Sequence, residues 1–149
     1  MKQTKQAILL RCASLLTLLF CAGHTYGSLK ITSRDPEEAA VFMAMQAYPF
    51  SIMGFRRTHW DFYQGLSLLF SATLLLLAVL LWQLAALAKD DPARVRPLVA
   101  TLTLGYLAFT VLSGMFFFTA PAVVSAAATV CIALAFTSGT RPGPAATLE

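Results

Sequence analysis

One polar cluster is the only part of this 149-residue chain where side chains that could do chemistry are concentrated. It runs from Arg56 to Tyr63 and reads Arg-Arg-Thr-His-Trp-Asp-Phe-Tyr. A carboxylate beside a guanidinium and aromatic rings can bind an amphipathic ligand, and the carboxylate can also transfer a proton. The candidate ligand- or partner-binding residues are Arg57, Trp60, Asp61 and Tyr63, with Tyr106 deeper in the membrane.

The same cluster also has an ordinary structural explanation. Thr58 and Asp61 have the spacing of a capping box, with Thr58 as the N-cap of a helix. Trp60 and Tyr63 suit the aromatic belt at a membrane interface. Arg57 can pair with Asp61 one turn on, although arginine before aspartate is the weaker orientation. A helix start and a binding site therefore both stay open.

Four apolar stretches set the fold class. A hydrocarbon core of about 30 Å needs roughly 20 helical residues, and the chain is 58% hydrophobic and only 12% charged. We therefore predict an all-α integral membrane four-helix bundle, formed as a single domain over residues 1–136. A tail over 137–149, rich in proline and glycine, is predicted to be disordered. The predicted spans are residues 7–22, 62–87, 98–118 and 121–136.

The long loop between the first two spans contains a helix signal. Asp35 is a good N-cap, Pro36 suits the first helical position, and Glu37 and Glu38 face the positive end of the helix dipole. These residues predict a short interfacial helix over 36–48 that lies along the outer membrane surface and ends before Pro49. It either covers the end of the bundle or acts as a lid over a binding site.

Periodicity predicts which helix faces are buried. On the second span, small and polar residues fall within an arc of about 60°, and we expect this seam to face the core. Its residues are Asp61, Gly65, Leu68, Ala72, Val79 and Gln83. A similar stripe on the third span consists of Val99, Thr103, Tyr106, Thr110 and Ser113. The alanine-rich fourth span allows close packing inside the bundle or in a homo-oligomer.

Charge predicts the topology. The first apolar stretch could be a secretory signal peptide, but no Ala-x-Ala pair follows it, so we predict a retained first helix. Seven of the eleven basic residues then lie inside and four outside, which favours an N-in/C-in arrangement. The outer four are Lys30, Arg34, Arg56 and Arg57.

Several function classes are disfavoured by what the chain lacks. Cys12, Cys21 and Cys131 all lie in predicted spans without a C-x-x-C pair, which argues against thiol oxidoreduction. His24 and His59 have no metal-site spacing, and no glycine-rich phosphate loop is present. The scattered basic residues do not form a nucleic-acid surface. We expect no cofactor, no metal and no nucleic acid, and the one certain partner is the lipid bilayer.

The segment over residues 43–65 resembles a family of small bacterial inner-membrane proteins of uncharacterised function. Their second helix begins with the signature Arg-Ser/Thr-x-Trp-Asp-x-Tyr-x-Gly, which here reads from Arg57 to Gly65. The resemblance implies a bacterial inner-membrane location and a four-helix layout, without an activity. The layout alone is also loosely similar to that of DoxX-like proteins, which is fold analogy.

The leading hypothesis is a non-enzymatic membrane protein that binds a small amphipathic ligand or a partner protein at its outer face. One alternative is a membrane enzyme for a lipid-like substrate, with Asp61 as acid or base and Tyr106 assisting. Another is a transporter subunit with Asp61 as a proton or cation site. A cavity reaching Asp61 would favour ligand binding or catalysis, and a polar path across the membrane would favour transport.

Overall fold

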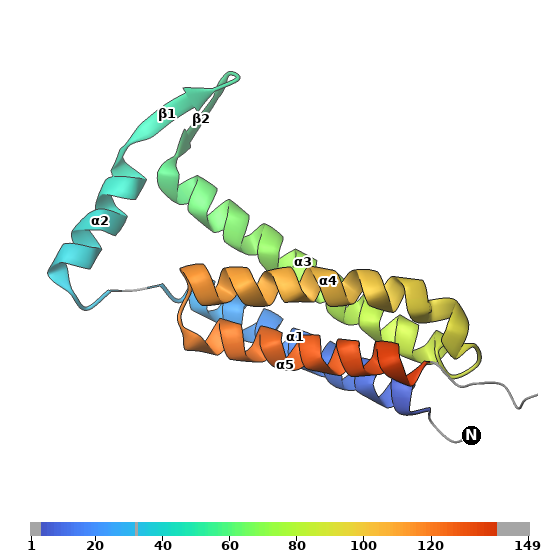
Figure 1. Ribbon diagram of the computed structural model, residues 1–149. Helices are drawn as coiled ribbons and strands as arrows, with labels where there is room; N and C mark the ends of the chain where they lie inside the picture. The colour runs from blue at the N-terminus through green and yellow to red at the C-terminus, as the bar shows by residue number, and fades with distance from the viewer. Residues whose placement is uncertain (1–3, 32, 140–149) are drawn as a thin grey trace, which may run out of the picture. The chain divides into compact units, whose positions relative to one another are not determined.

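The computed structural model describes residues 4–31 and 33–139 (Figure 1). The chain forms two compact units, and two of the helices contribute a part to each. Unit 1 consists of Met1–Phe20 and Leu75–Glu149, and unit 2 of Cys21–Leu74. The elements are α1 (Lys5–Leu29), α2 (Pro36–Ala47), β1 (Pro49–Ile52), β2 (Phe55–Thr58), α3 (His59–Leu87), α4 (Pro92–Phe116) and α5 (Thr119–Ser138).

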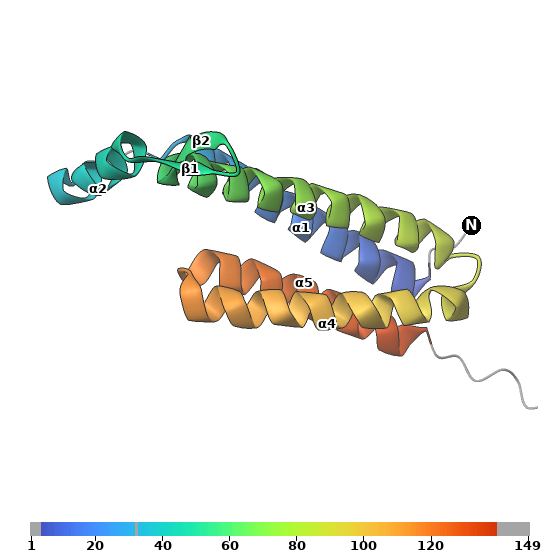
Figure 2. The same ribbon diagram turned by 90° about the horizontal axis from the view of Figure 1, so that it is seen from above.

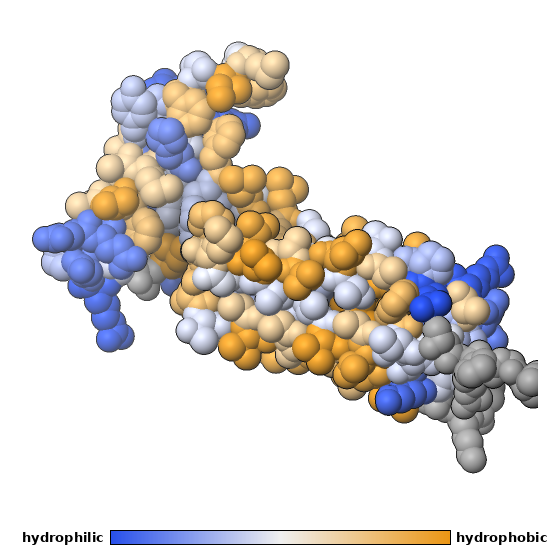
Figure 3. Space-filling model, viewed as in Figure 1, coloured by the Kyte–Doolittle hydropathy of each residue, from blue (hydrophilic) through white to orange (hydrophobic). Residues whose placement is uncertain are grey.

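The helices α1, α3, α4 and α5 are each long and apolar enough to cross a membrane. This confirms a mostly helical chain with four candidate membrane spans. The apolar surface that α4 and α5 present in Figure 3 is what contact with lipid requires. The first helix is longer than the predicted span of 7–22, because hydropathy falls at its polar end while the helix continues. There the hydroxyls of Thr25 and Ser28 donate hydrogen bonds to the carbonyls of Cys21 and His24, one turn earlier.

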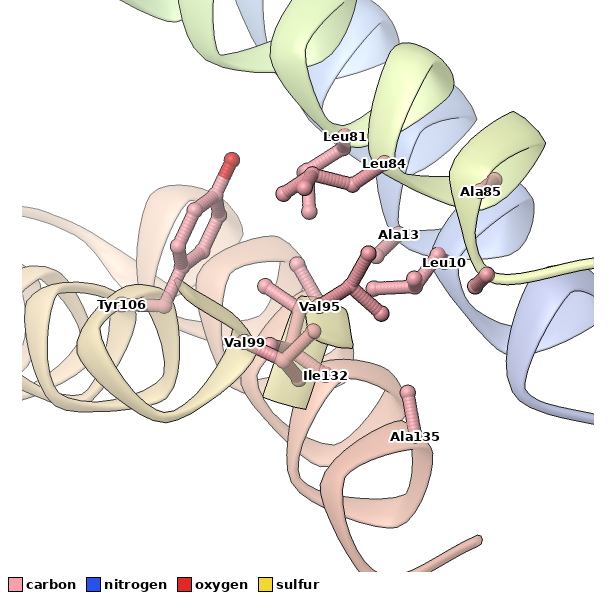
Figure 4. Close-up of a cluster of buried hydrophobic side chains, with 12 residues drawn as sticks. Leu10, Ala13, Leu81, Leu84, Ala85, Val95, Val99, Tyr106, Ile132 and Ala135 are labelled. Carbon is pink, nitrogen blue, oxygen red and sulfur yellow. The ribbon is translucent and has the colours of Figure 1, made fainter. Parts of the chain in front are cut away.

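Unit 1 has an apolar core to which four helices contribute (Figure 4). The predicted stripe on α4 is confirmed, because Val99, Tyr106 and Ser113 are buried. In Figures 1 and 2, α4 and α5 run side by side in opposite directions. The small residues Ser125 and Ala128 of α5 are buried, as close packing inside the bundle requires. Whether the same helix also forms a homo-oligomer stays a prediction.

Hydroxyl groups link the helices of unit 1. The Ser14 hydroxyl on α1 donates a hydrogen bond to the carbonyl of Ala78 on α3, at 2.7 Å. The hydroxyls of Thr110 on α4 and Thr129 on α5 lie 3.0 Å apart. Inside a membrane such groups have no water to bind, so bonds between helices fix the register at which the helices pack.

Unit 2 contains a second set of polar contacts between α1 and α3. The Thr25 and Ser71 hydroxyls lie 2.9 Å apart, and the Cys21 thiol donates to the Ser71 carbonyl at 3.3 Å. The His24 Nε2 lies 3.2 Å from the carbonyl oxygen of Ser67. The Gln64 amide donates to the Ser28 carbonyl, also at 3.2 Å.

The predicted seam on α3 is therefore wrong. All six of its residues are exposed, and a Cβ added to Gly65 would meet no other atom within 4 Å. The rule that polar groups turn inward holds, but it applies to Ser67 and Ser71, whose partners on α1 are not adjacent in sequence. The predicted seam was centred on Asp61. Because the Asp61 carboxylate accepts a hydrogen bond from the Thr58 amide at the helix start, it does not have to face the core. The seam residues are Asp61, Gly65, Leu68, Ala72, Val79 and Gln83.

The loop helix α2 is confirmed, with the predicted cap. The Asp35 carboxylate accepts a hydrogen bond from the Glu37 amide at 2.9 Å, and the helix ends at Ala47, before Pro49. None of the described residues of α2 is buried. Its position along a membrane surface stays a prediction.

The hairpin β1–β2 was not predicted. Its strands are antiparallel and join through Met53 and Gly54, whose φ values are +49° and +85°. Two positive φ angles define a type I′ turn, which matches the twist of a hairpin. Gly54 adopts such a φ freely, whereas methionine at the first position is an unusual turn residue and gave no signal.

The predicted end of the last span is two residues early. Thr137 and Ser138 belong to α5, so the predicted tail does not begin at 137. The rest of that tail, residues 140–149, lies outside the described residues. The grouping of residues 1–136 as a single domain stays a prediction.

A pair of matched substitutions tests the corrected face of α3. Gly65→Leu points into open space and removes a helix glycine, so we expect an unchanged or slightly higher free energy of unfolding. Ala78→Leu adds the same kind of side chain where Ala78 is 3% exposed, and we expect a loss of roughly 1–3 kcal/mol. Denaturant titration in detergent micelles measures both. A larger loss at Gly65 than at Ala78 would restore the original seam.

Candidate functional site

The start of α3 is a capping box, as predicted. The Thr58 amide donates to Asp61 Oδ2 at 2.8 Å, and the Asp61 amide donates to the Thr58 hydroxyl at 3.1 Å. Each residue thereby satisfies a backbone N–H that has no partner within the helix. The Asp61 side chain is exposed, and its carboxylate is turned back toward its own backbone.

Arg57 does not pair with Asp61. Its guanidinium donates to the neighbouring carbonyl of Arg56 at 2.9 Å, and its Cζ lies 5.8 Å from the ring centre of Phe55. Over residues 4–31 and 33–139, no carboxylate forms an ion pair with either arginine. The two guanidinium groups are therefore exposed without a counter-ion from the described chain.

Trp60 joins the cap to the loop helix. Its ring stacks on that of Tyr63 with centroids 5.6 Å apart, and the Phe42 ring of α2 meets it edge-on at 5.7 Å. Trp60 is half-buried and Tyr63 exposed. Aromatic pairs of this geometry are worth about 0.5–1.5 kcal/mol beyond the area they bury.

His59 joins the cap to the hairpin. Its ring lies parallel to that of Tyr48 at 6.3 Å and against that of Phe50 at 4.9 Å. The Phe50 ring also contacts Phe62 at 5.4 Å. These contacts connect β1 to the first turn of α3, so the hairpin is held by side chains as well as by the peptide bond at its end.

The hairpin presents apolar side chains at its tip. Met53 is 95% exposed and Phe55 63% exposed, and Ile52 pairs with Phe55 across the strands. Side chains alternate between faces along a strand, so Phe55 and Arg57 share one face while Arg56 lies on the other. The tip is therefore an exposed apolar group with a guanidinium on each side of the hairpin.

Tyr106 belongs to unit 1 and has a structural partner there. It is 2% exposed, and Figure 4 shows its ring extending from α4 toward the other helices of the unit. Its hydroxyl lies 2.7 Å from that of Thr17, which already donates to the Ala13 carbonyl at 2.8 Å. Tyr106 must then be the donor, so its proton is used within the core.

Four of the five predicted candidates thus lie together in unit 2, and Tyr106 is part of the core of unit 1. The prediction missed the polar contacts of His24 and Thr25 with α3, although the run of polar residues after Cys21 was a signal. Among the described residues, no group of three metal-binding side chains lies close enough to hold an ion. The described cysteines are all free.

Comparison with protein-family models, with curated proteins and with solved structures finds no match to this chain. Function therefore has to be inferred from the contacts of these residues.

A mutant cycle tests whether Asp61 is more than a cap. We expect Asp61→Asn to cost about 1 kcal/mol or less and Arg57→Gln to change little, because the two side chains do not contact each other. Free energies of unfolding in detergent should then show a coupling below about 0.5 kcal/mol. Asp61→Glu is the control that keeps the charge. Coupling of a few kcal/mol would instead indicate a desolvated ion pair.

Proposed function

We propose that this chain is a non-enzymatic, multi-pass membrane protein that binds a partner protein through the hairpin β1–β2. The observation that supports this most is the exposed tip, where Met53 projects between Ile52 and Phe55. Methionine, phenylalanine and arginine are enriched where proteins bind one another. An exposed apolar tip of this kind typically marks an interaction site.

The exposure of the cluster favours a protein over a small ligand. Small molecules bind in concave pockets that bury most of their surface, whereas Arg57, Asp61 and Tyr63 are all exposed. A projecting hairpin suits a macromolecular partner, because the partner can provide a groove into which the hairpin fits. Of the two binding hypotheses drawn from the sequence, we therefore favour the partner protein.

The chemistry of the hairpin defines the kind of partner. Arg56 and Arg57 form no ion pair with a carboxylate of the described residues, so an acidic segment would complement them. The sheet has two strands, and each has one edge that is not paired within it. An extended segment can add to such an edge through backbone hydrogen bonds. The proposed partner segment is therefore extended and acidic, with an apolar contact to Met53.

The aromatic contacts and the cap give this surface a fixed position on α3. A preorganised surface loses less conformational entropy on binding than a flexible loop. The alternatives drawn from the sequence have less support. Asp61 is exposed and bound to its own helix start, which does not favour a role as catalytic acid, catalytic base or ion site.

We also propose a bacterial inner-membrane location with both termini inside, and α2 lying along the outer surface. The distribution of lysine and arginine supports this topology, and the signature from Arg57 to Gly65 supports the location. Retention of the first helix is supported by contacts in its last two turns. There, Thr25 and Ser28 both bond to α3, so cleavage would remove contacts that unit 2 uses.

The topology predicts the behaviour of a reporter that is active only in the cytoplasm. Fused after Glu149 it should be active, and inserted after Arg34 it should be inactive, because that loop would lie outside. An insertion in the short segment at Asp90 serves as the control and should be active. Activity after Arg34 would place the hairpin in the cytoplasm and contradict the topology.

Photo-crosslinking in cells of the source organism tests the hairpin. With a benzophenone amino acid at Met53, we expect one discrete protein adduct, whereas the same group at Glu37 should give none. Arg56→Glu with Arg57→Glu should reduce the adduct at least about tenfold, because it reverses the complementary charge. Arg56→Lys with Arg57→Lys should retain most of it. An adduct with lipid alone, or one insensitive to charge reversal, would contradict the proposal.

A further inference from the structure

A pocket on unit 1 lies between the first turns of α4 and the last turn of α5. Its volume is about 350 Å³, and it is lined by Ala93, Arg96, Pro97 and Phe136. In Figures 1 and 2 these ends of the two helices lie next to each other. The pocket is open to the surface rather than enclosed, so a headgroup could occupy it while the rest of the molecule stays outside.

The guanidinium of Arg96 is held in place but not neutralised. Its Cζ lies 4.4 Å from the ring centre of Phe136, and its Nε is buried without a hydrogen-bond partner among the described residues. None of the described carboxylates forms an ion pair with it. The nearby acid Asp91 caps α4 by accepting from the Arg94 amide at 3.1 Å. Because Nε is buried, the two Nη groups are the donors that can face an anion in the pocket, and the uncompensated charge attracts one.

Arg96 lies near the boundary between the hydrocarbon core and the lipid headgroups. A helix of 25 residues is roughly 37 Å long, about 7 Å more than the hydrocarbon core, so each end extends about 3.5 Å beyond the core. Arg96 is the fifth residue, roughly 6 Å from the start, so its backbone lies just inside the core and its long side chain reaches the headgroups. Exposed leucines follow on the same side of the helix, namely Leu104 and Leu107, and these can contact acyl chains.

We propose that this pocket binds the phosphate of an anionic phospholipid. The Arg96 guanidinium donates hydrogen bonds to the phosphate oxygens, and Phe136 holds the guanidinium plane from behind. The acyl chains run along the apolar surface of α4. Basic pockets between membrane helices are a recurring site for lipid headgroups.

Native mass spectrometry of the detergent-solubilised protein tests this site, with phosphatidylglycerol and phosphatidylcholine of identical acyl chains. We expect wild type to bind phosphatidylglycerol more tightly than phosphatidylcholine. Arg96→Gln should weaken phosphatidylglycerol binding about five- to tenfold, the equivalent of roughly 1–1.4 kcal/mol. Arg94→Gln removes the same charge from an exposed position and should change little. Equal weakening by the two variants would mean that only net charge matters, and would overturn the site.

A second variant keeps the charge and fills the pocket. Ala93→Leu should abolish the preference for phosphatidylglycerol even if Arg96→Gln fails to fold, because Ala93 is exposed and tolerates a larger helix former. Ala108→Leu, at another exposed position of α4, is its control. Competition by inorganic phosphate at the lipid's own concentration would assign the pocket to a free anion and overturn the lipid proposal. Unchanged lipid binding in Ala93→Leu would overturn the pocket itself.

Discussion

The need to satisfy polar groups inside apolar helices is the constraint on which the rest of this structure depends. Burial of apolar surface does not choose a helix face in lipid, because lipid is as apolar as leucine. Hydroxyl groups, in contrast, do determine which helix faces pack together. Ser14, Thr17 and Thr110 each have a partner on another helix of unit 1. Each such bond contributes only about 0.6 kcal/mol on average, but each also specifies one register.

The second organising feature is the helix start at Thr58 and Asp61. It ends the hairpin and begins α3 within a single turn, and its aromatic neighbours connect α3 to α2 and to the hairpin. The residues that look most like a catalytic site in the sequence thus have a structural role. The functional interest moves to the side chains that this arrangement leaves exposed, namely the hairpin tip and the two arginines beside it.

Four arginines of the chain illustrate two different environments. Arg56 and Arg57 are exposed on a projecting hairpin, where their charge is available to a partner. Arg11 and Arg96 of unit 1 are half-buried, and their guanidinium groups lie over Trp82 and Phe136 at 4.9 and 4.4 Å. A guanidinium over a ring stays charged while its apolar face is covered. The sequence alone counts all four as topology signals, but their surroundings give them different roles.

What the sequence determined by itself is local or set by length. The four spans, the caps at Asp35 and Thr58, and the stripe around Tyr106 all follow from residues within a few turns of one another. The tertiary structure decided which face of α3 is buried, because Ser67 and Ser71 find partners on α1 that lie more than 40 residues away in sequence. It also decided that Asp61 bonds to Thr58 without an ion pair to Arg57, and that the Tyr106 hydroxyl bonds to Thr17. Successive residues of a helix are rotated by about 100°, so several different faces can be drawn from one sequence. The neighbouring helix that supplies hydrogen-bond partners determines which of them is buried.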